Sequence, residues 1–297
     1  MTVGEDQLDS RFRAAVAAMD AGRITELERL VSEYPRLVSS RLERPGPWLR
    51  DKVPNALKGF FAKPYLLWFV AEDPVRNDRI ADNVVDVMHL LIGTARRTGA
   101  TNLQEQLDTT LRLVCWSWVA ARQKLQIPMI DVLIDAGAAP AENAQNALVN
   151  GHLDAAAHLL ERGGTVTLAA ALTLGRFDDV PRLARAASPA QRQFAFVLAA
   201  LNGRADGVAW MIRDGIPINQ PSADLYPHGT PLHHAVASGS LDTVEAMLAG
   251  GADRTVSDTA WNGTPLGWAQ HYVENAPAER RERYRLIAEL LRSNGER

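Results

Sequence analysis

The chain repeats one short phrase at a fixed distance. Residues 229–253 read GTPLHHAVASGSLDTVEAMLAGGAD, and the phrase TPL that opens at Thr230 returns at Thr264, 34 residues later. A period of roughly 20–50 residues is the signature of stacked supersecondary units, each of which buries its apolar face against its neighbours. This feature constrains the fold most, because it predicts a scaffold built unit by unit rather than around one central core.

Each copy of the phrase carries the signals of a helix start. Thr230 is a good N-cap, because its hydroxyl accepts a hydrogen bond from a free N–H of the first turn, and Pro231 suits the next position, where no donor is needed. Leu232 and Ala235 then lie on one helix face, and Gly239 can take the left-handed conformation that ends the helix. The second copy repeats this start with Thr264, Pro265 and Leu266.

A second short helix is predicted directly after the first, and Gly251 ends it in a left-handed conformation. Both helices have only two to three turns, which leaves each of them marginal alone in water. They therefore need packed neighbours. We expect Leu232 and Leu248 to be buried between adjacent units, where they hold the stack together.

The phrase resembles a known repeat family. TPLHHA, from Thr230 to Ala235, matches the pattern T-P-L-H-x-A that is typical of the ankyrin repeat, and GAD at Gly251 fits the end of the same unit. The resemblance implies that His233 forms hydrogen bonds within and between hairpins. The next unit reads TPLGWAQ and departs from the pattern at Gly267, so no histidine role carries over to it.

Weaker copies of the same skeleton precede this unit. The order helix, glycine, helix recurs at 14–38, 147–164, 171–187 and 197–219, and parts of it lie at 64–92 and 133–140. The predicted fold is an all-α, ankyrin-type solenoid of stacked helix pairs with about eight partly degenerate repeats. It spans 1–297 as one domain: a first repeat at 8–40, a connection at 41–63, degenerate repeats at 64–229, the best-matching repeat at 230–263 and a capping repeat at 264–297. Extended pairing is expected only around 222–229 and 256–263.

Composition and charge indicate which classes of partner and which cell compartment suit the chain. A net charge of −3 does not favour nucleic acid, and no apolar stretch is long enough to span a bilayer. The first residues have no apolar core of a signal peptide, and the single cysteine, Cys115, suits a reducing compartment, so a cytoplasmic location is expected. The excess of Arg over Lys resembles that of GC-rich bacterial genomes. Apolar neighbours predict that Cys115 is buried and inert.

No catalytic, nucleotide-binding or cofactor motif is present in the sequence, which favours a protein that is not an enzyme and holds no cofactor. A metal site could be drawn from His228, His233 and His234 with Asp224 nearby, but the spacing fits no zinc pattern, so no metal is expected. The predicted function is a protein-interaction scaffold that binds another protein through its concave face. Neither the partner's identity nor the oligomeric state follows from the sequence.

Aromatic and polar residues on the hairpin tips and first helices are the candidate contacts. Tyr226 and His228 are placed on one hairpin tip and Trp261 on the next, where Trp261 either meets a partner or folds back on its own hairpin. The first helices add Ser238, His271 and Tyr272, and the basic segment Arg41–Lys63 adds Trp48.

Two further predictions concern an alternative function and the burial of three tryptophans. An alternative function, a hydrolase or small-ligand-binding protein, needs a polar site near His228, Asp258 and His271. The tryptophans Trp68, Trp116 and Trp118 lie in apolar helical stretches and are predicted to be core residues.

Overall fold

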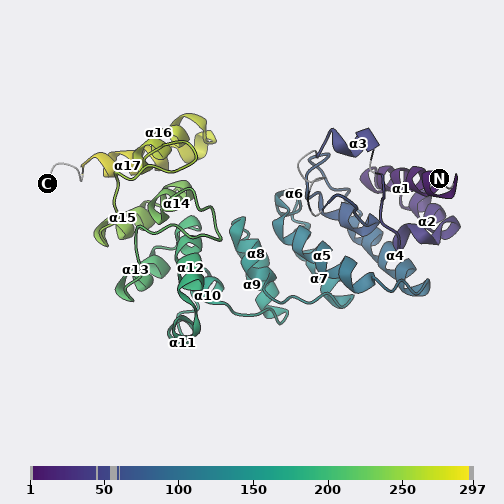
Figure 1. Ribbon diagram of the computed structural model, residues 1–297, viewed down its shortest axis with the longest axis horizontal. Helices are drawn as coiled ribbons and strands as arrows, with labels where there is room; N and C mark the ends of the chain where they lie inside the picture. Colours follow the sequence, from purple (N-terminus) through teal and green to yellow (C-terminus); the bar gives the residue numbers. More distant parts are fainter. Residues whose placement is uncertain (1–2, 45, 54–58, 60, 294–297) are drawn as a thin grey trace. The chain divides into compact units, whose positions relative to one another are not determined.

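The computed structural model describes residues 3–44, 46–53, 59 and 61–293 (Figure 1). Over these ranges the chain is helical and has no β-strand; its one isolated bridge joins Ser222 and Leu225, inside a segment where extended pairing was predicted. The chain divides into two compact units, Met1–Thr165 and Val166–Arg297. The single continuous solenoid and its repeat boundaries stay predictions, whereas the all-helical, repeat-like fold is confirmed.

The first unit consists of helix pairs in two layers. The first helix of each pair packs on the first helix of the next pair, and these helices form one layer (Figure 1). The second helices of the pairs pack on one another in the same way and form the other layer. The first layer holds α1 (Val3–Asp20), η3 (Leu66–Ala71), α5 (Leu103–Trp116) and α8 (Asn143–Val149); the second holds α2 (Ile24–Glu33), α4 (Val84–Arg97), α7 (Gln126–Asp135) and α9 (Leu153–Glu161). Shorter elements join them: η1 (Pro35–Val38), α3 (Gly46–Arg50) and α6 (Trp118–Arg122).

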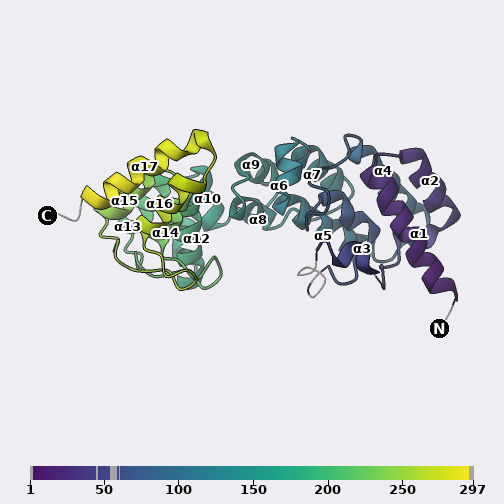
Figure 2. The same cartoon turned by 90° about the horizontal axis from the view of Figure 1, so that it is seen from above.

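The second unit repeats this plan: its pairs follow one another in Figure 1 and lie over one another in the view from above (Figure 2). The first layer holds α10 (Leu168–Leu174), α12 (Pro189–Leu201), α14 (Pro231–Ser238) and α16 (Pro265–Asn275); the second holds α11 (Val180–Ala186), α13 (Ala205–Arg213), α15 (Leu241–Ala249) and α17 (Ala278–Ser293). Small side chains and leucines fill the space between the layers, as in α12, where 195–200 are all buried. Packing against neighbours therefore stabilises helices that are too short to persist alone.

Left-handed glycines end the helices where the sequence predicted. Gly239 follows α14 with φ 73°, and Gly251 follows α15 with φ 89°. Residues with a Cβ rarely take such φ values, which is why glycine stands here. The other predicted helix-breaking glycines, Gly22, Gly151, Gly175 and Gly203, also have positive φ. The sequence therefore located the turns between layers correctly in both units.

Two burial predictions need correction. Leu232 is fully buried, but Leu248 is only half-buried, because the buried stripe of α15 runs through Val244 and Met247 and leaves the next position at its edge. Trp118 is 47% exposed rather than core. The reason is local, because α5 ends at Trp116 and a new helix, α6, begins after Ser117, whose hydroxyl caps it. The Trp118 indole therefore does not continue the buried face of α5.

The other predicted core tryptophans differ in burial. Trp68 is buried and Trp116 is half-buried. Cys115 is buried as predicted, and burial raises the pKa of its thiol far above the usual range. No described helix is long and apolar enough to cross a membrane.

The described part of the segment Arg41–Lys63 packs on the first unit. The Arg41 guanidinium lies over the rings of Tyr65 (4.1 Å) and Trp68 (5.2 Å), and Phe61 meets Phe69 edge to face at 5.2 Å. Trp48 belongs to α3, but its side chain lies outside the described residues, as do positions 45, 54–58 and 60. Its role as a partner contact stays a prediction.

Candidate functional site

The candidate site is a group of rings between two consecutive hairpins of the second unit, which we call the hairpin cluster. Its members are Tyr226, His228, His234, Trp261 and Trp268. The hairpin before α14 supplies two of them, the hairpin before α16 supplies Trp261, and the two helices supply the rest. The backbone joins the hairpins, since the N–H of Thr259 donates to the carbonyl of His228 at 2.8 Å.

His233 fastens the start of α14 to the next hairpin. Its Nδ1 accepts from the Thr230 N–H at 3.1 Å and lies 2.8 Å from the Thr230 hydroxyl, which completes a capping box. Its Nε2–H then donates to the carbonyl of Gly263 at 3.0 Å. Both ring nitrogens are occupied, and burial lowers the pKa of the side chain although its bond to the Gly263 carbonyl acts in the opposite direction. The predicted bonding within and between hairpins is confirmed.

Asp258 organises the second hairpin. Its carboxylate is 3% exposed and accepts hydrogen bonds from the backbone N–H groups of Ala260 (2.8 Å), Trp261 (2.7 Å) and Gly263 (2.8 Å), and from the Trp268 indole N–H (2.9 Å). Burial favours the neutral acid, but the bonds from Trp261, Trp268 and the other backbone donors outweigh it and lower the pKa of Asp258 to about 2. The Asp258 carboxylate is therefore ionised at neutral pH, and it holds the loop that carries Trp261 through these hydrogen bonds.

The rings of the cluster touch one another in a chain centred on His228. The ring centroid of His228 lies 6.3 Å from that of Tyr226, 5.0 Å from Trp261 and 5.9 Å from Trp268. Trp261 meets Trp268 at 5.7 Å, with the planes 63° apart. Even so, Trp261 is 70% exposed and Tyr226 is 43% exposed. Trp261 thus contacts His228 and Trp268 and still offers most of its surface to solvent, and its contact with a partner stays a prediction.

The family comparison overlaps this stretch at α14 and its His234. The ankyrin repeat family model matches residues 229–259, which run from the turn before α14 to the hairpin of Trp261. Residues 229–259 form an ankyrin repeat. No curated protein shows significant similarity to the chain.

The second unit brings only some of the predicted contacts together. Tyr226, His228 and Trp261 belong to one cluster, whereas Tyr272 stacks on Tyr284 of α17 at 4.7 Å. His271, which is exposed, pairs through Nδ1 with the Asn275 amide on its own helix, at 3.2 Å. Ser238 lies at the other end of α14 from the hairpin, where its hydroxyl donates to the Ala235 carbonyl at 2.6 Å. The structure thus gathers three of the predicted contacts at the hairpin end of α14 and separates the other three from them, and the role of all of them in binding stays a prediction.

The alternative polar site near His228, Asp258 and His271 gains little from this geometry. Each Asp258 oxygen accepts two N–H donors, so the carboxylate is engaged in holding the hairpin and is a poor base at a pKa of about 2. The described residues contain no group of three His, Cys, Asp or Glu side chains that could hold a metal ion.

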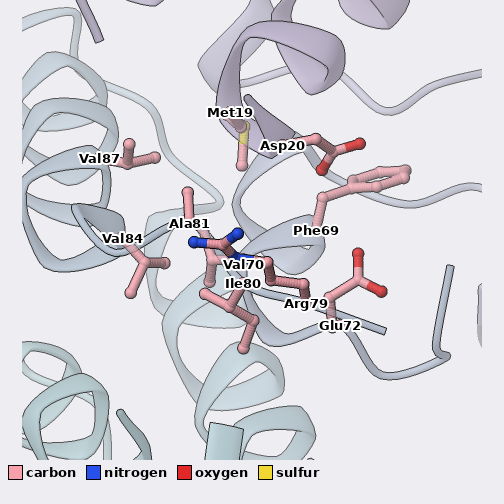
Figure 3. Close-up of a pocket in the computed structure, with 10 residues that line it drawn as sticks. All are labelled: Met19, Asp20, Phe69, Val70, Glu72, Arg79, Ile80, Ala81, Val84 and Val87. Atoms are coloured by element: carbon pink, nitrogen blue, oxygen red, sulfur yellow. The ribbon is translucent and has the colours of Figure 1, made fainter. Parts of the chain in front are cut away.

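The first unit carries a feature that sequence reasoning missed. A small pocket is lined by Met19, Asp20, Phe69, Val70, Glu72, Arg79, Ile80, Ala81, Val84 and Val87 (Figure 3). The carboxylates of Asp20 and Glu72 lie on one side, and Val84 and Val87 lie on the other. Buried Arg76 joins the two acids, at 2.8 Å from each, over the ring of Phe69.

This ion-pair network fixes the polar insert between η3 and α4. The insert, residues 73–82, folds around Glu72, which accepts from the backbone N–H groups of Arg76 (2.6 Å) and Asn77 (2.9 Å). The Glu72 and Arg76 side chains are 2% and 3% exposed, so both charges are nearly desolvated. The spacing Glu-x-x-x-Arg in the sequence was the one signal that could have indicated the pair.

Proposed function

We propose that the protein is a non-catalytic interaction scaffold that binds another protein through the hairpin cluster of its second unit. Ankyrin repeats are in general protein-interaction modules, which supports the class of function. One observation supports the place: Trp261 is a large aromatic side chain, 70% exposed, on a loop whose buried Asp258 carboxylate accepts three hydrogen bonds from the loop and one from Trp268 of α16.

The physical reason is preorganisation. Binding costs free energy when loops and side chains become ordered, and a site that is ordered beforehand avoids much of that cost. Asp258 holds the backbone of Trp261, and the indole of Trp268 shares the same carboxylate. Trp and Tyr are also the residues that most often dominate interface energies. Tyr226 and Trp261 therefore form a rigid aromatic anchor suited to a partner's surface.

Comparative affinity purification from the native host tests the proposal. Parent protein, Trp261→Ala and the matched control Trp118→Ala are used as baits, and retained proteins are quantified. Trp118 is also an exposed tryptophan, but it lies in the first unit under Arg122. We expect a protein that the parent and Trp118→Ala retain and that Trp261→Ala loses. Equal retention by all three baits contradicts the proposed site.

We further propose a cytoplasmic location and no catalytic activity. The free, buried Cys115 suits a reducing compartment. The occupied oxygens of Asp258 argue against its use as a catalytic base.

A further inference from the structure

The sequence around the hairpin cluster is strongly acidic in a chain that is nearly neutral. Residues 216–275, which run from the hairpin before α14 to the end of α16, hold six Asp or Glu and one Arg, a formal charge of −5. The whole chain carries −3, so the remaining residues carry +2. The charge of this region is therefore a local property, and it favours a cationic partner.

The one basic residue of this region does not face the cluster. The Arg254 guanidinium donates to the carbonyl of Leu291 on α17, at 3.4 Å. The exposed carboxylate of Asp224, by contrast, lies two residues before Tyr226 on the same hairpin. Next to Tyr226 and Trp261 in the sequence, residues 216–275 thus supply the exposed carboxylate of Asp224 and the buried carboxylate of Asp258, and their one Arg is engaged with α17.

The rings themselves present electron-rich faces. Trp is the best aromatic acceptor of a cation, and Trp261 and Trp268 lie together with Tyr226 in the cluster. The Trp268 indole N–H donates to the ionised Asp258 carboxylate at 2.9 Å, which pushes electron density towards the ring. Two of the histidines that pack on Trp268, His233 and His234, add no opposing charge at neutral pH, because burial lowers the pKa of His234 to about 4 and lowers that of His233 as well.

The molecule uses the same kind of contact elsewhere. Arg41 stacks over Tyr65 at 4.1 Å, and Arg122 over Trp118 at 4.7 Å. Among the described residues, no cation–π pair involves Trp261, Trp268 or Tyr226. The most exposed aromatic surface of the second unit therefore has ring faces without an internal cation, in an acidic surrounding.

We propose that the hairpin cluster recognises an arginine side chain in a basic segment of the partner protein, with the guanidinium stacked on Trp261 and attracted by Asp224 and Asp258. Arginine fits better than lysine, because its planar, weakly hydrated guanidinium stacks on aromatic faces. This inference rests on the proposed function, since it names the chemistry of the partner at the same site.

The test is a selection of random peptides displayed on phage against the full chain, followed by binding measurements with the selected peptides made synthetically. We expect enriched peptides that share one arginine. Replacing this arginine by citrulline, its neutral isostere, should weaken binding about fivefold or more, which corresponds to about 1 kcal/mol of cation–π and charge attraction. Trp261→Leu should weaken binding similarly, Trp261→Phe should retain part of it, and Trp118→Leu should leave it unchanged.

The outcomes separate the two ideas. Peptides that need Trp261 but carry no common arginine, or that bind equally well with citrulline, overturn the arginine inference and leave the proposed function standing. Failure to enrich any peptide, or enrichment only of peptides that bind Trp261→Leu as tightly as the parent, contradicts the proposed function, and the inference falls with it. Thermal melts of each variant confirm that the loss is not due to unfolding.

Discussion

Acidification to about pH 4 should destabilise the second unit through one buried histidine, His234. This side chain is 2% exposed, and its Nε2–H donates to the Tyr226 carbonyl at 3.2 Å. Burial lowers the pKa of His234 to about 4, which the hydrogen bond to Tyr226 offsets only in part. The perturbation is therefore simple: a fall in pH forces a proton onto an imidazole that the fold keeps neutral.

The sign and size follow from the two pKa values. In the unfolded chain the imidazole titrates near pH 6.5, so between about pH 6.5 and 4 the unfolded state binds more protons than the folded state. Folding stability is full above pH 6.5 and falls as the pH drops towards 4. A difference of about 2.5 pKa units corresponds to a loss of about 3 kcal/mol from this one group.

Asp73 in the first unit acts in the opposite direction. Burial raises the pKa of this carboxyl to about 6, so the folded state binds the extra proton between about pH 6 and 3.8, and stability rises as the pH falls through this range. The free energy of unfolding of the parent, plotted against pH, therefore falls by less than the protonation of His234 alone would cause. Only the difference between the parent and a variant that lacks the imidazole isolates it.

The assay compares the parent with His234→Gln, which does not titrate, by urea denaturation at several pH values between about 7 and 4. The free energy of unfolding of the parent should fall relative to that of the variant by about 3 kcal/mol across this range. An NMR titration of the His234 ring should also give a midpoint near 4. A difference that is flat with pH, or a ring midpoint near 6.5, refutes the argument that burial keeps this histidine neutral.

Three further predictions concern packing. Leu232→Ala should cost about 2–5 kcal/mol of unfolding free energy and Leu248→Ala clearly less, because only the first side chain is fully buried; equal losses in urea denaturation would contradict this. Gly203→Ala should destabilise more than Gly251→Ala, since both have positive φ but only at Gly203 does the added Cβ meet an atom, Ser240 Cβ at 2.9 Å; the order of melting temperatures checks it. Glu72→Gln should cost about 3 kcal/mol by leaving a buried guanidinium with less compensation, and a variant as stable as the parent would mean the ion pair is dispensable.

The sequence predicted the helices, their ends and the ankyrin repeat because these depend on local signals. Thr230 and Pro231 start α14, and the glycines Gly239 and Gly251 have the left-handed φ values that their positions require. Such signals act within one turn of the chain, so they can be read from residue order alone. The role of His233 followed from the repeat pattern in the same way.

Long-range burial could not be read so directly. Leu248 is apolar, but it lies one position beyond the buried Val244 and Met247 of α15 and is only half-buried. The contacts of Asp258 with Trp268 and of Glu72 with Arg76 depend on how a loop folds back. Polar residues in loops carry no periodicity, so the residues that organise the hairpin and the insert were not distinguished from ordinary solvated ones.

The central claim is that the hairpin cluster binds a protein partner through an anchor that is not part of the core. The most direct measurement is the dissociation constant of the purified partner for the parent and for Trp261→Ala, with thermal melts of both proteins. We predict that the variant binds about 30-fold more weakly, equivalent to about 2 kcal/mol, and melts at the same temperature as the parent. An unchanged dissociation constant would contradict the claim for this surface, and a collapsed melt would place Trp261 in the core.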